Sequence, residues 1–247
     1  GVSPDEQTLA SLSHQGTEVL RLAIRSDSHI EATVGESGAT AVLRTPTPIH
    51  RRRWYFVGIS ADAPTGQLGV SCAERGTSVF SVERTQAGWN GIPRDSDTLL
   101  LGASLENESV HNSFSGKIGG IRIFEGLLDD IDLSDLKQGA EPEGGRCEGA
   151  WDLARLTTGT RAVDISGHGR HGQIHNGAAR AVTGPEWQGT DTTIGSAPRL
   201  YDAVHLHDDD LADAKWLPTF TLSVPADARS GIYAVRLSTE EEEVALS

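Results

Sequence analysis

The strongest constraint on this chain is a hydrophobic alternation with a period of two residues, which recurs in many short segments. In "VLRLAIR" it places Leu20, Leu22 and Ile24 on one face of an extended strand. Turns with glycine or proline separate such segments, and no spacing typical of strand–helix–strand units occurs. The segments with this pattern are 19–25, 30–34, 39–45, 53–60, 67–74, 78–85 and 98–104. The pattern predicts an all-β protein built as a sandwich or a barrel.

One short helix is predicted after these strands. The segment "DDIDLSDLKQG" (129–139) starts with acidic residues and ends at Gly139, as a short helix does. Further strands are predicted in the later segments "GAWDLARL", "RAVDISG", "AVHLH" (203–207), "TFTLSVP" (219–225) and "GIYAVRLS" (231–238). The acidic run 240–243 is interpreted as a solvated end.

These elements predict two domains. Residues 1–198 are expected to form the sandwich, and residues 199–247 the start of a second β unit that leads to an absent catalytic domain. The chain contains no methionine and begins Gly-Val-Ser-Pro, so we expect it to be a fragment of a longer protein. A targeting sequence would then be lost with the missing end.

The acidic balance of the 247 residues restricts the partners. A formal net charge of -14 repels phosphate backbones and anionic lipid headgroups, so neither nucleic acid nor a membrane is expected as a partner. The basic cluster Arg51–Arg53 directly precedes the aromatic run 54–56 and is interpreted as the polar start of a strand. Cys72 and Cys147 are too few for a disulfide framework; we expect two free, buried thiols in a cytoplasmic protein, with one bridge as the alternative.

The segment "AVHLHDDDLADAKW" (203–216) is the candidate metal site. If this segment is a strand, His205 and His207 share one face, with their Cα atoms roughly 6.6 Å apart. Imidazoles at that spacing are able to bind one ion at about 2.1 Å per bond. The favoured alternative is a polar turn in which the aspartates accept hydrogen bonds from backbone N–H groups. The candidate ligands are His205, His207, Asp208, Asp209 and Asp210.

Other motifs of catalysis are weak or missing. "GHGRHG" (167–172) matches the G-x-G-x-x-G template for dinucleotides, but the following segment has no helical period, so we interpret its glycines as turn residues. The sequence has no G-x-S-x-G, H-E-x-x-H, P-loop or C-x-x-C motif. A pair of glycosidase carboxylates is not singled out among the many acidic residues.

A first resemblance concerns the fold. The segments "RRRWYFVGISADAPTGQLGVSC" and "LLLGASLENESVHNSFSGKIGGIRIFEGLLDDIDLSDL" (99–136) resemble laminin-G-like, or concanavalin A-like, jelly-roll sandwiches. Gly119 and Gly120 stand where that family often has an acidic residue. "DISGHGRHGQI" (164–174) resembles a segment found near the start of such domains, and we expect it to pair back onto the sheet.

A second resemblance concerns the parent protein. "GAWDLAR", "NGAARAVTGPEWQG", "YDAVHLHDDDLADAKW" and "FTLSVPADARSGIYAVRL" resemble the large (beta) subunit of N,N-dimethylformamidase. The resemblance implies a metal-dependent hydrolase of small amides, with an iron held by tyrosine and glutamate in a later domain. Tyr55, Tyr201 and Tyr233 match no iron-binding segment, so no catalytic residue and no cofactor are assigned to this chain.

The predicted role is therefore structural. We expect a non-catalytic segment that contacts the catalytic domain of its parent chain, with a small subunit or a second copy as a further partner. The rival interpretation is a lectin-like module that binds carbohydrate through Trp54, Trp89 or Trp151, although these residues suit a core better.

Overall fold

The computed structural model describes most of the chain as two compact units, Gly1–Ala212 and Asp213–Ser247. Each unit is considered by itself. The described residues are 6–35, 41–62, 64–77, 81–86, 92, 98–106, 109–126, 128–207, 217, 221–229, 231, 235–238 and 243–246.

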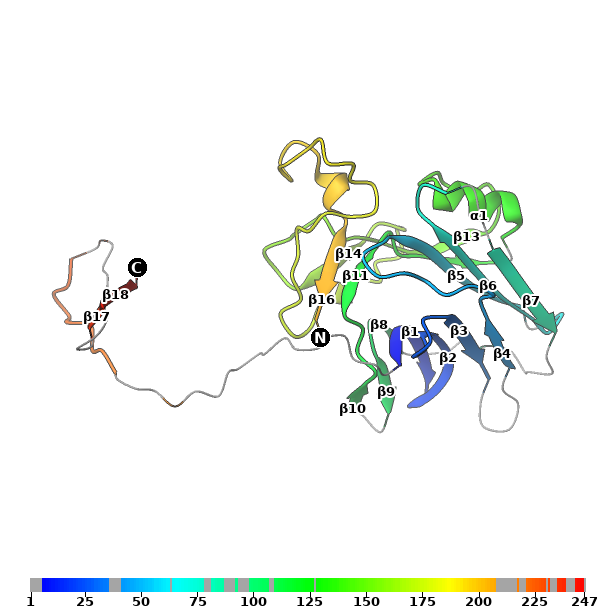
Figure 1. Ribbon diagram of the computed structural model, residues 1–247, viewed down its shortest axis with the longest axis horizontal. Helices are drawn as coiled ribbons and strands as arrows, with labels where there is room; N and C mark the ends of the chain where they lie inside the picture. The colour runs from blue at the N-terminus through cyan, green and yellow to red at the C-terminus, as the bar shows by residue number, and fades with distance from the viewer. Residues whose placement is uncertain are drawn as a thin grey trace. The chain divides into compact units, whose positions relative to one another are not determined.

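Two antiparallel sheets form the body of the first unit (Figure 1). The larger sheet has the strand order β4-β3-β2-β1-β8, and the smaller has the order β5-β6-β7. The strands of the larger sheet are β1 (Gln7–His14), β2 (Thr17–Ile24), β3 (Ile30–Val34), β4 (Ala41–Arg44) and β8 (Thr98–Leu101). Those of the smaller sheet are β5 (Tyr55–Asp62), β6 (Gln67–Glu74) and β7 (Ser81–Gln86).

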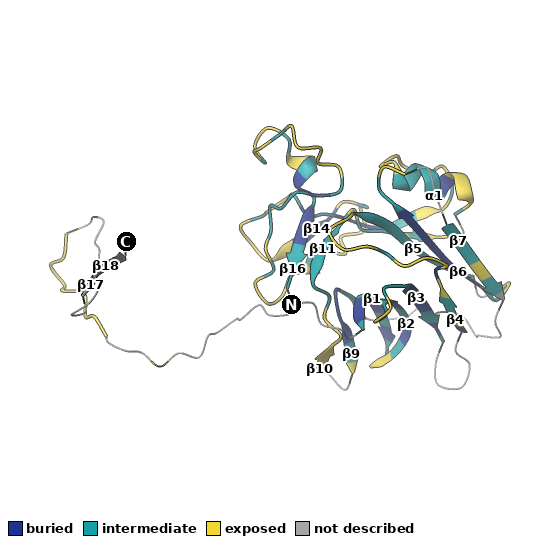
Figure 2. Cartoon of the chain, viewed as in Figure 1, coloured by how far each residue is buried: buried dark blue, intermediate teal, exposed yellow. Residues whose placement is uncertain are grey.

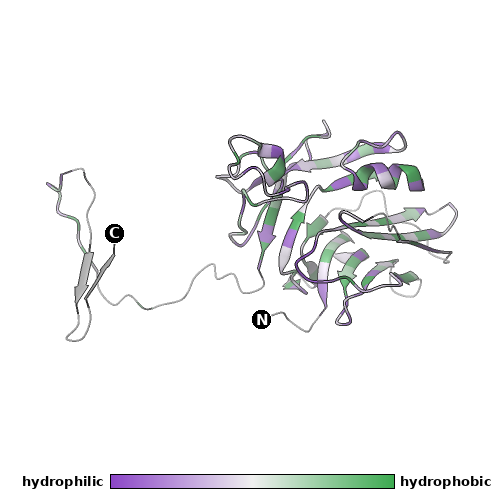
Figure 3. Ribbon diagram, turned by 45° about the horizontal axis from the view of Figure 1, so that its top comes forward, coloured by the Kyte–Doolittle hydropathy of each residue, from purple (hydrophilic) through white to green (hydrophobic). Residues whose placement is uncertain are grey.

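The core lies between these two sheets. Ile30 and Val34 of β3 are buried together with Leu68 and Val70 of β6 in one apolar cluster. Figure 2 shows buried residues along β6, and Figure 3 shows hydrophobic and hydrophilic residues alternating along the strands of this unit. The predicted all-β, sandwich-like class is confirmed, because the alternation turns one face of each strand toward this shared core.

The remaining described strands of the first unit form further sheets. β9 (Ser104–Glu106) pairs with β10 (Ser109–His111), and β11 (Gly116–Gly119) pairs with β16 (Ala203–Leu206). A sheet of order β12-β13-β14-β15 carries a second core, in which Trp151, Leu153, Ala162 and Val204 are buried. Its strands are β12 (Arg122–Glu125), β13 (Arg146–Asp152), β14 (Arg161–Asp164) and β15 (Gly172–Gln173). A 3₁₀ turn, η1 (Pro198–Tyr201), precedes β16.

The predicted helix is confirmed as α1 (Asp130–Lys137). Asp129 caps its N-terminus: its carboxylate accepts hydrogen bonds from the backbone N–H groups of Ile131 and Asp132. The side chain of Asp132 reaches back to the Asp129 N–H and completes a capping box. Gly139 follows the helix with a φ of 79°, the left-handed conformation expected of a stop residue.

Two parts of the sandwich differ from the expectation. The sequence does not predict β1, although β1 pairs with both β2 and β8, because two register shifts interrupt its pairing with β2 and break the period of two. The cluster Arg51–Arg53 is not the start of a strand. Residues 51–52 form a turn in which Arg52 has a φ of 61°, and β5 begins at Tyr55.

The second unit contains one described strand pair, β17 (Val235–Ser238) with β18 (Glu243–Leu246). The first lies within the predicted strand 231–238. The strand predicted at 219–225 is wrong over 221–225, which have no strand pairing; Leu222 and Val224 there are exposed, so the alternation has no covering layer. The predicted domain boundary at 198/199 stays a prediction, whereas the compact units divide after Ala212.

Both cysteines are free thiols, as expected. Cys72 is buried in the sandwich core, and Cys147 is only half-buried. Burial raises the pKa of the Cys72 thiol to about 11, which keeps it protonated and unreactive at neutral pH. In the part of the chain that the structure describes, no helix is long and apolar enough to cross a membrane.

The sandwich core predicts a strong effect of truncating Leu68. Leu68 is 0% exposed, so Leu68→Ala leaves a cavity and is expected to lower the free energy of unfolding by about 2–5 kcal/mol. Val42 is 52% exposed on neighbouring β4, and Val42→Ala serves as the control with an expected change of at most about 0.5 kcal/mol. Urea unfolding of both variants measures the difference, and equal losses would contradict a core at Leu68.

Candidate functional site

The two candidate metal-binding histidines lie at the end of β16. Val204 and Leu206 point into the second core, so the alternation of the strand turns His205 and His207 to the other face. The two imidazole rings are near neighbours, with centroids 3.8 Å apart and planes inclined by 56°. The structure thus brings together the two histidines that the sequence singles out; Asp208, Asp209 and Asp210 lie outside the described residues.

The spacing of the rings is shorter than chelation requires. Two imidazoles bound to one tetrahedral ion at about 2.1 Å per bond place their ring centroids about 5 Å apart. One ring must therefore turn away before both nitrogens reach the same ion. Among the described residues, no group of three or more histidine, cysteine or acidic side chains is arranged to hold a metal. The metal site stays a prediction.

Lys117 adds a positive charge beside the histidine pair. It stands directly opposite His205 in the antiparallel pairing of β11 and β16, where facing side chains share one side of the sheet. Its ammonium group donates hydrogen bonds to the carbonyl and the hydroxyl of Thr183, at 3.2 and 2.8 Å. A fixed cation at this position disfavours a second cation nearby.

The described tyrosines do not fit an iron site of the tyrosine–glutamate kind. The Tyr201 hydroxyl donates to the carbonyl of Asp191. The Tyr55 hydroxyl lies 3.4 Å from the Glu74 carboxylate, which also pairs with Arg53. Burial raises the pKa of Tyr55, which opposes the phenolate form that a metal needs. No step of chemistry is therefore assigned to an iron in this chain.

The glycine-rich loop 164–171 is a structural turn. Asp164 is buried, and its carboxylate accepts hydrogen bonds from the N–H groups of Ala150, Ser166 and Arg170. Burial alone would raise the pKa of Asp164, but the hydrogen bonds from Ser166, Arg170 and Ala150 together bring it below the usual range. Since Asp164 already occupies the N–H groups that would hold a phosphate, the loop is unsuited to a nucleotide, as predicted.

The same loop is fastened to β13. Gly167 and Gly169 adopt positive φ angles of 92° and 71°, and no helix follows them. The Trp151 indole N–H donates to the carbonyl of Arg170 at 2.8 Å, and the Arg170 guanidinium pairs with Glu148. β14 also pairs with β13 and β15. Segment 164–174 pairs only within the sheet β12-β13-β14-β15 among the described residues, so the expectation that it pairs back onto a sandwich sheet is wrong.

Arg180 donates five hydrogen bonds to backbone carbonyls. One guanidinium nitrogen donates to the carbonyls of residues 156, 159 and 161, and the other to those of residues 153 and 155. Burial lowers the pKa of Arg180. The guanidinium thereby holds together the loop between β13 and β14, which otherwise has carbonyl groups that need partners.

Asp202 ties the segment before β16 to the same loop. Its carboxylate accepts a hydrogen bond of 2.6 Å from the Leu153 N–H, next to Asp152. Burial raises the pKa of Asp202, and the charge of Asp152 raises it further. Ala179 and His205 exchange backbone hydrogen bonds of 3.0 and 2.9 Å. Arg180, Asp202 and the Ala179–His205 bridge together form what we call the clasp.

Sequence reasoning misses the clasp. Arg180 and Asp202 both occur in segments quoted for the family resemblance, yet no motif marks them. The local signal is faint: Arg180 is an arginine in a turn-rich stretch whose nearest acidic residue in the sequence is Glu186. Its partners are carbonyls of loop residues, which carry no mark in a sequence.

A shallow pocket of about 230 Å³ lies where the smaller sheet meets the start of α1. Ser60, Gln67, Gly69, Arg84 and Asp129 contribute to its lining. Gly69 keeps it open, because a Cβ atom there would approach the Ser60 hydroxyl to 2.5 Å. The Asp129 carboxylate is already bound as the cap of α1, and Arg84 pairs with Asp130 at 2.5 Å, so the pocket has no unpaired charged group among these residues.

The tryptophans that the lectin-like alternative proposes as sugar-binding residues do not form an aromatic platform among the described residues. Trp151 is buried in the second core and Trp54 is half-buried, whereas Trp89 lies outside the described residues. The expectation that Trp151 is a core residue is confirmed. An exposed indole does occur at Trp187, 38% exposed, but its N–H donates to the carbonyl of Asp191 within its own loop.

Fold and site together define an all-β, sandwich-like protein whose described residues hold a structural clasp and no assembled metal centre. Comparison with known proteins shows which members of this class the chain resembles. A family model described as "N,N-dimethylformamidase beta subunit-like, C-terminal" matches residues 178–246, which begin at the clasp. Over these residues the chain is similar to the N,N-dimethylformamidase beta subunit.

Two relatives agree with this match. The N,N-dimethylformamidase beta subunit of Alcaligenes sp is 27% identical over 241 residues, covering 88% of this chain and 32% of the relative. The N,N-dimethylformamidase beta subunit of Paracoccus aminophilus is 27% identical over 235 residues, covering 85% of this chain and 31% of the relative. The chain spans about a third of the length of these curated relatives.

The contacts of Arg180 predict a large structural effect of its removal. Arg180→Gln withdraws the donors from five carbonyls and is expected to lower the free energy of unfolding by about 2 kcal/mol. Arg155 pairs with Asp152 through a side chain that is 63% exposed, so the control Arg155→Gln should change stability by at most about 0.5 kcal/mol. Chemical denaturation compares them, and a neutral Arg180→Gln would refute the clasp.

The metal prediction is tested by elemental analysis. Protein purified without a nickel column is dialysed against zinc, and bound metal is measured for the unchanged chain and for His205→Ala. One ion per chain that disappears in His205→Ala supports the predicted site. Lys117→Ala is expected to strengthen binding, because it removes the neighbouring positive charge. Absence of bound metal in all three proteins would rule out the site.

Proposed function

We propose that this chain is a non-catalytic β-sandwich segment of the large subunit of a dimethylformamidase-like amidohydrolase. Its role is structural. It holds the polypeptide segment that leads toward a catalytic domain, and it also contacts another subunit. The observation that carries this proposal is the clasp, because the family-matched segment starts at residue 178 and Arg180 fastens it at once. The finer fold that we propose for the sandwich is a concanavalin A-like, laminin-G-like jelly roll.

The clasp supports a holding function by its position. The first part of the matched segment, residues 178–207, belongs to the first unit, where β16 pairs with β11 and Val204 is buried in the second core. The later part, from Asp213, belongs to the second unit. The sandwich therefore supplies a fixed starting point for the segment that follows.

The proposed reaction of the parent is hydrolysis of the carbon–nitrogen bond of a small amide; the name N,N-dimethylformamidase, which both relatives carry, supports it. Both relatives are named as beta subunits, which supports a partner subunit for the parent of this chain. The described tyrosines are engaged in other contacts, so we place the iron that the resemblance implies outside the described residues. This placement agrees with a segment that supports chemistry without performing it.

The second candidate is carbohydrate binding, and the pocket beside α1 is the feature that favours it. Hydroxyl, amide and guanidinium groups of Ser60, Gln67 and Arg84 line part of this hollow, beside the apolar side chains of Leu68 and Leu128, and such groups suit a hydroxylated ligand. The structural role is the stronger proposal, because the pocket is shallow and lacks an aromatic side chain for stacking among its lining residues.

Turnover measurements separate these proposals from an enzymatic one. The purified 247-residue chain, loaded with ferrous or ferric iron, is expected to release no formate from dimethylformamide above the blank. Formate that rises in proportion to protein concentration would refute the non-catalytic role. Saturable binding on a glycan array, lost in Arg84→Ala, would favour the carbohydrate-binding candidate instead.

A further inference from the structure

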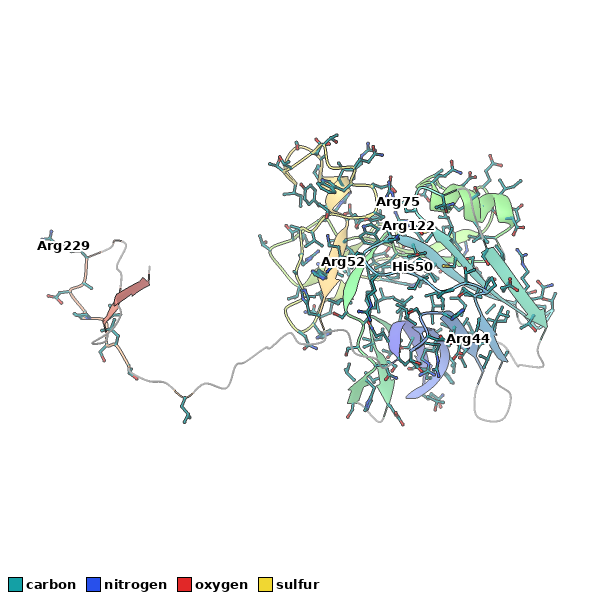
Figure 4. All side chains as sticks on the ribbon, in the orientation of Figure 1. Arg44, His50, Arg52, Arg75, Arg122 and Arg229 are labelled. Atoms are coloured by element: carbon teal, nitrogen blue, oxygen red, sulfur yellow. The ribbon has the colours of Figure 1, made fainter. Side chains whose placement is uncertain are left out.

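The turn that precedes β5 carries a local excess of positive charge. His50, Arg51, Arg52 and Arg53 follow one another in the sequence and are all exposed. Arg75, at the end of β6, lies beside them, because its backbone N–H donates to the carbonyl of Trp54 at 2.8 Å. Figure 4 labels His50, Arg52 and Arg75 in this part of the molecule. We call these five residues the basic turn.

We propose that the basic turn is a docking surface for an acidic segment of a partner polypeptide. This inference rests on the proposed structural role and names the chemistry of its subunit contact. The partner is defined by carboxylate groups, which accept paired hydrogen bonds from the planar guanidinium group of arginine.

Intramolecular pairing leaves part of this charge uncompensated. Arg53 pairs with Glu74 at 2.5 Å, and Arg75 pairs with Glu186 at 3.1 Å. In the described part of the chain, Arg51 and Arg52 have no ion-pair partner. Two guanidinium groups therefore face solvent together in a chain whose net charge is -14. They are available to an incoming carboxylate without breaking an existing pair.

The backbone of the turn is strained at the residue that presents one of these groups. Arg52 has a φ of 61°, a left-handed conformation that costs a residue with a Cβ atom about 1 kcal/mol. Glycine would adopt this conformation at almost no cost. The arginine side chain thus stands where the fold alone favours glycine.

A hydrogen bond to the first residue of β5 holds the turn in place. The His50 N–H donates to the Tyr55 hydroxyl at 2.9 Å, and the same hydroxyl lies near the Glu74 carboxylate that pairs with Arg53. Trp54 is half-buried between the turn and β5. A surface that is already ordered loses little conformational entropy when a partner binds.

Charge complementarity favours an acidic protein segment over nucleic acid or lipid. Attraction to the basic turn acts within a Debye length of about 8 Å at physiological salt. A long polyphosphate or an anionic membrane also meets the remaining surface of a chain with 35 acidic and 21 basic residues, and that surface repels it. A short acidic peptide contacts the turn alone.

The test measures binding of a fluorescein-labelled oligoglutamate peptide by fluorescence anisotropy at low salt. The unchanged chain is expected to bind, and binding should weaken as sodium chloride is raised. The double variant Arg51→Gln/Arg52→Gly removes the two unpaired charges and relieves the strain at 52, so we expect about fivefold weaker binding with undiminished thermal stability.

A matched control variant removes the same number of positive charges as the test variant. Arg44→Gln/Arg146→Gln removes two exposed arginines that pair with Asp27, Glu31, Glu125 and Glu148 elsewhere, and it should leave peptide affinity within about twofold of the unchanged chain. Equal losses in the two double variants, or no binding by the unchanged chain, would overturn the proposal. So would equally tight, Arg51- and Arg52-dependent binding of a single-stranded DNA oligonucleotide. Formate release by the chain would refute the non-catalytic role without changing these binding results.

Discussion

The burial of β6 between its two neighbours and against β3 and β4 holds the first unit together. Six consecutive residues of β6, Leu68–Ala73, are buried, so both faces of this strand are covered. One face meets the apolar side chains of the larger sheet, including Ile30 and Val34. The basic turn precedes β5, and the start of α1 lies beside Leu68 and Gly69 of β6, so both features adjoin this packed pair of sheets.

The clasp supplies hydrogen-bond partners to the loop between β13 and β14. The loop between β13 and β14 has many backbone carbonyls and little regular pairing, and such groups need hydrogen-bond donors. A single guanidinium group satisfies five of them, and Asp202 accepts the N–H of Leu153 from the opposite direction. Because both side chains belong to the segment around β16, the loop and that segment stabilise one another. The family-matched stretch, residues 178–246, begins within the first unit.

Sequence reasoning predicts the strands best where the apolar residues of a strand have a covering layer. Segments 30–34 and 67–74 are found with the predicted bounds as β3 and β6. It fails at β1, where register shifts disturb the period, and at 221–225, where alternation occurs with no strand pairing. Of the candidate site, the neighbouring positions of His205 and His207 follow from the strand period, whereas their ring distance depends on side-chain rotation.

The sequence by itself determined the all-β class, the capped helix α1 and the resemblance to the N,N-dimethylformamidase beta subunit, because these depend on local periods, on caps and on the order of quoted segments. Only the tertiary structure decided that Arg180 meets carbonyls from residues 153 to 161 and that Arg75 joins the arginines of the turn before β5. Such contacts join residues that lie apart in the chain. Every residue has a backbone carbonyl, so no letter of the sequence marks in advance which carbonyls Arg180 meets.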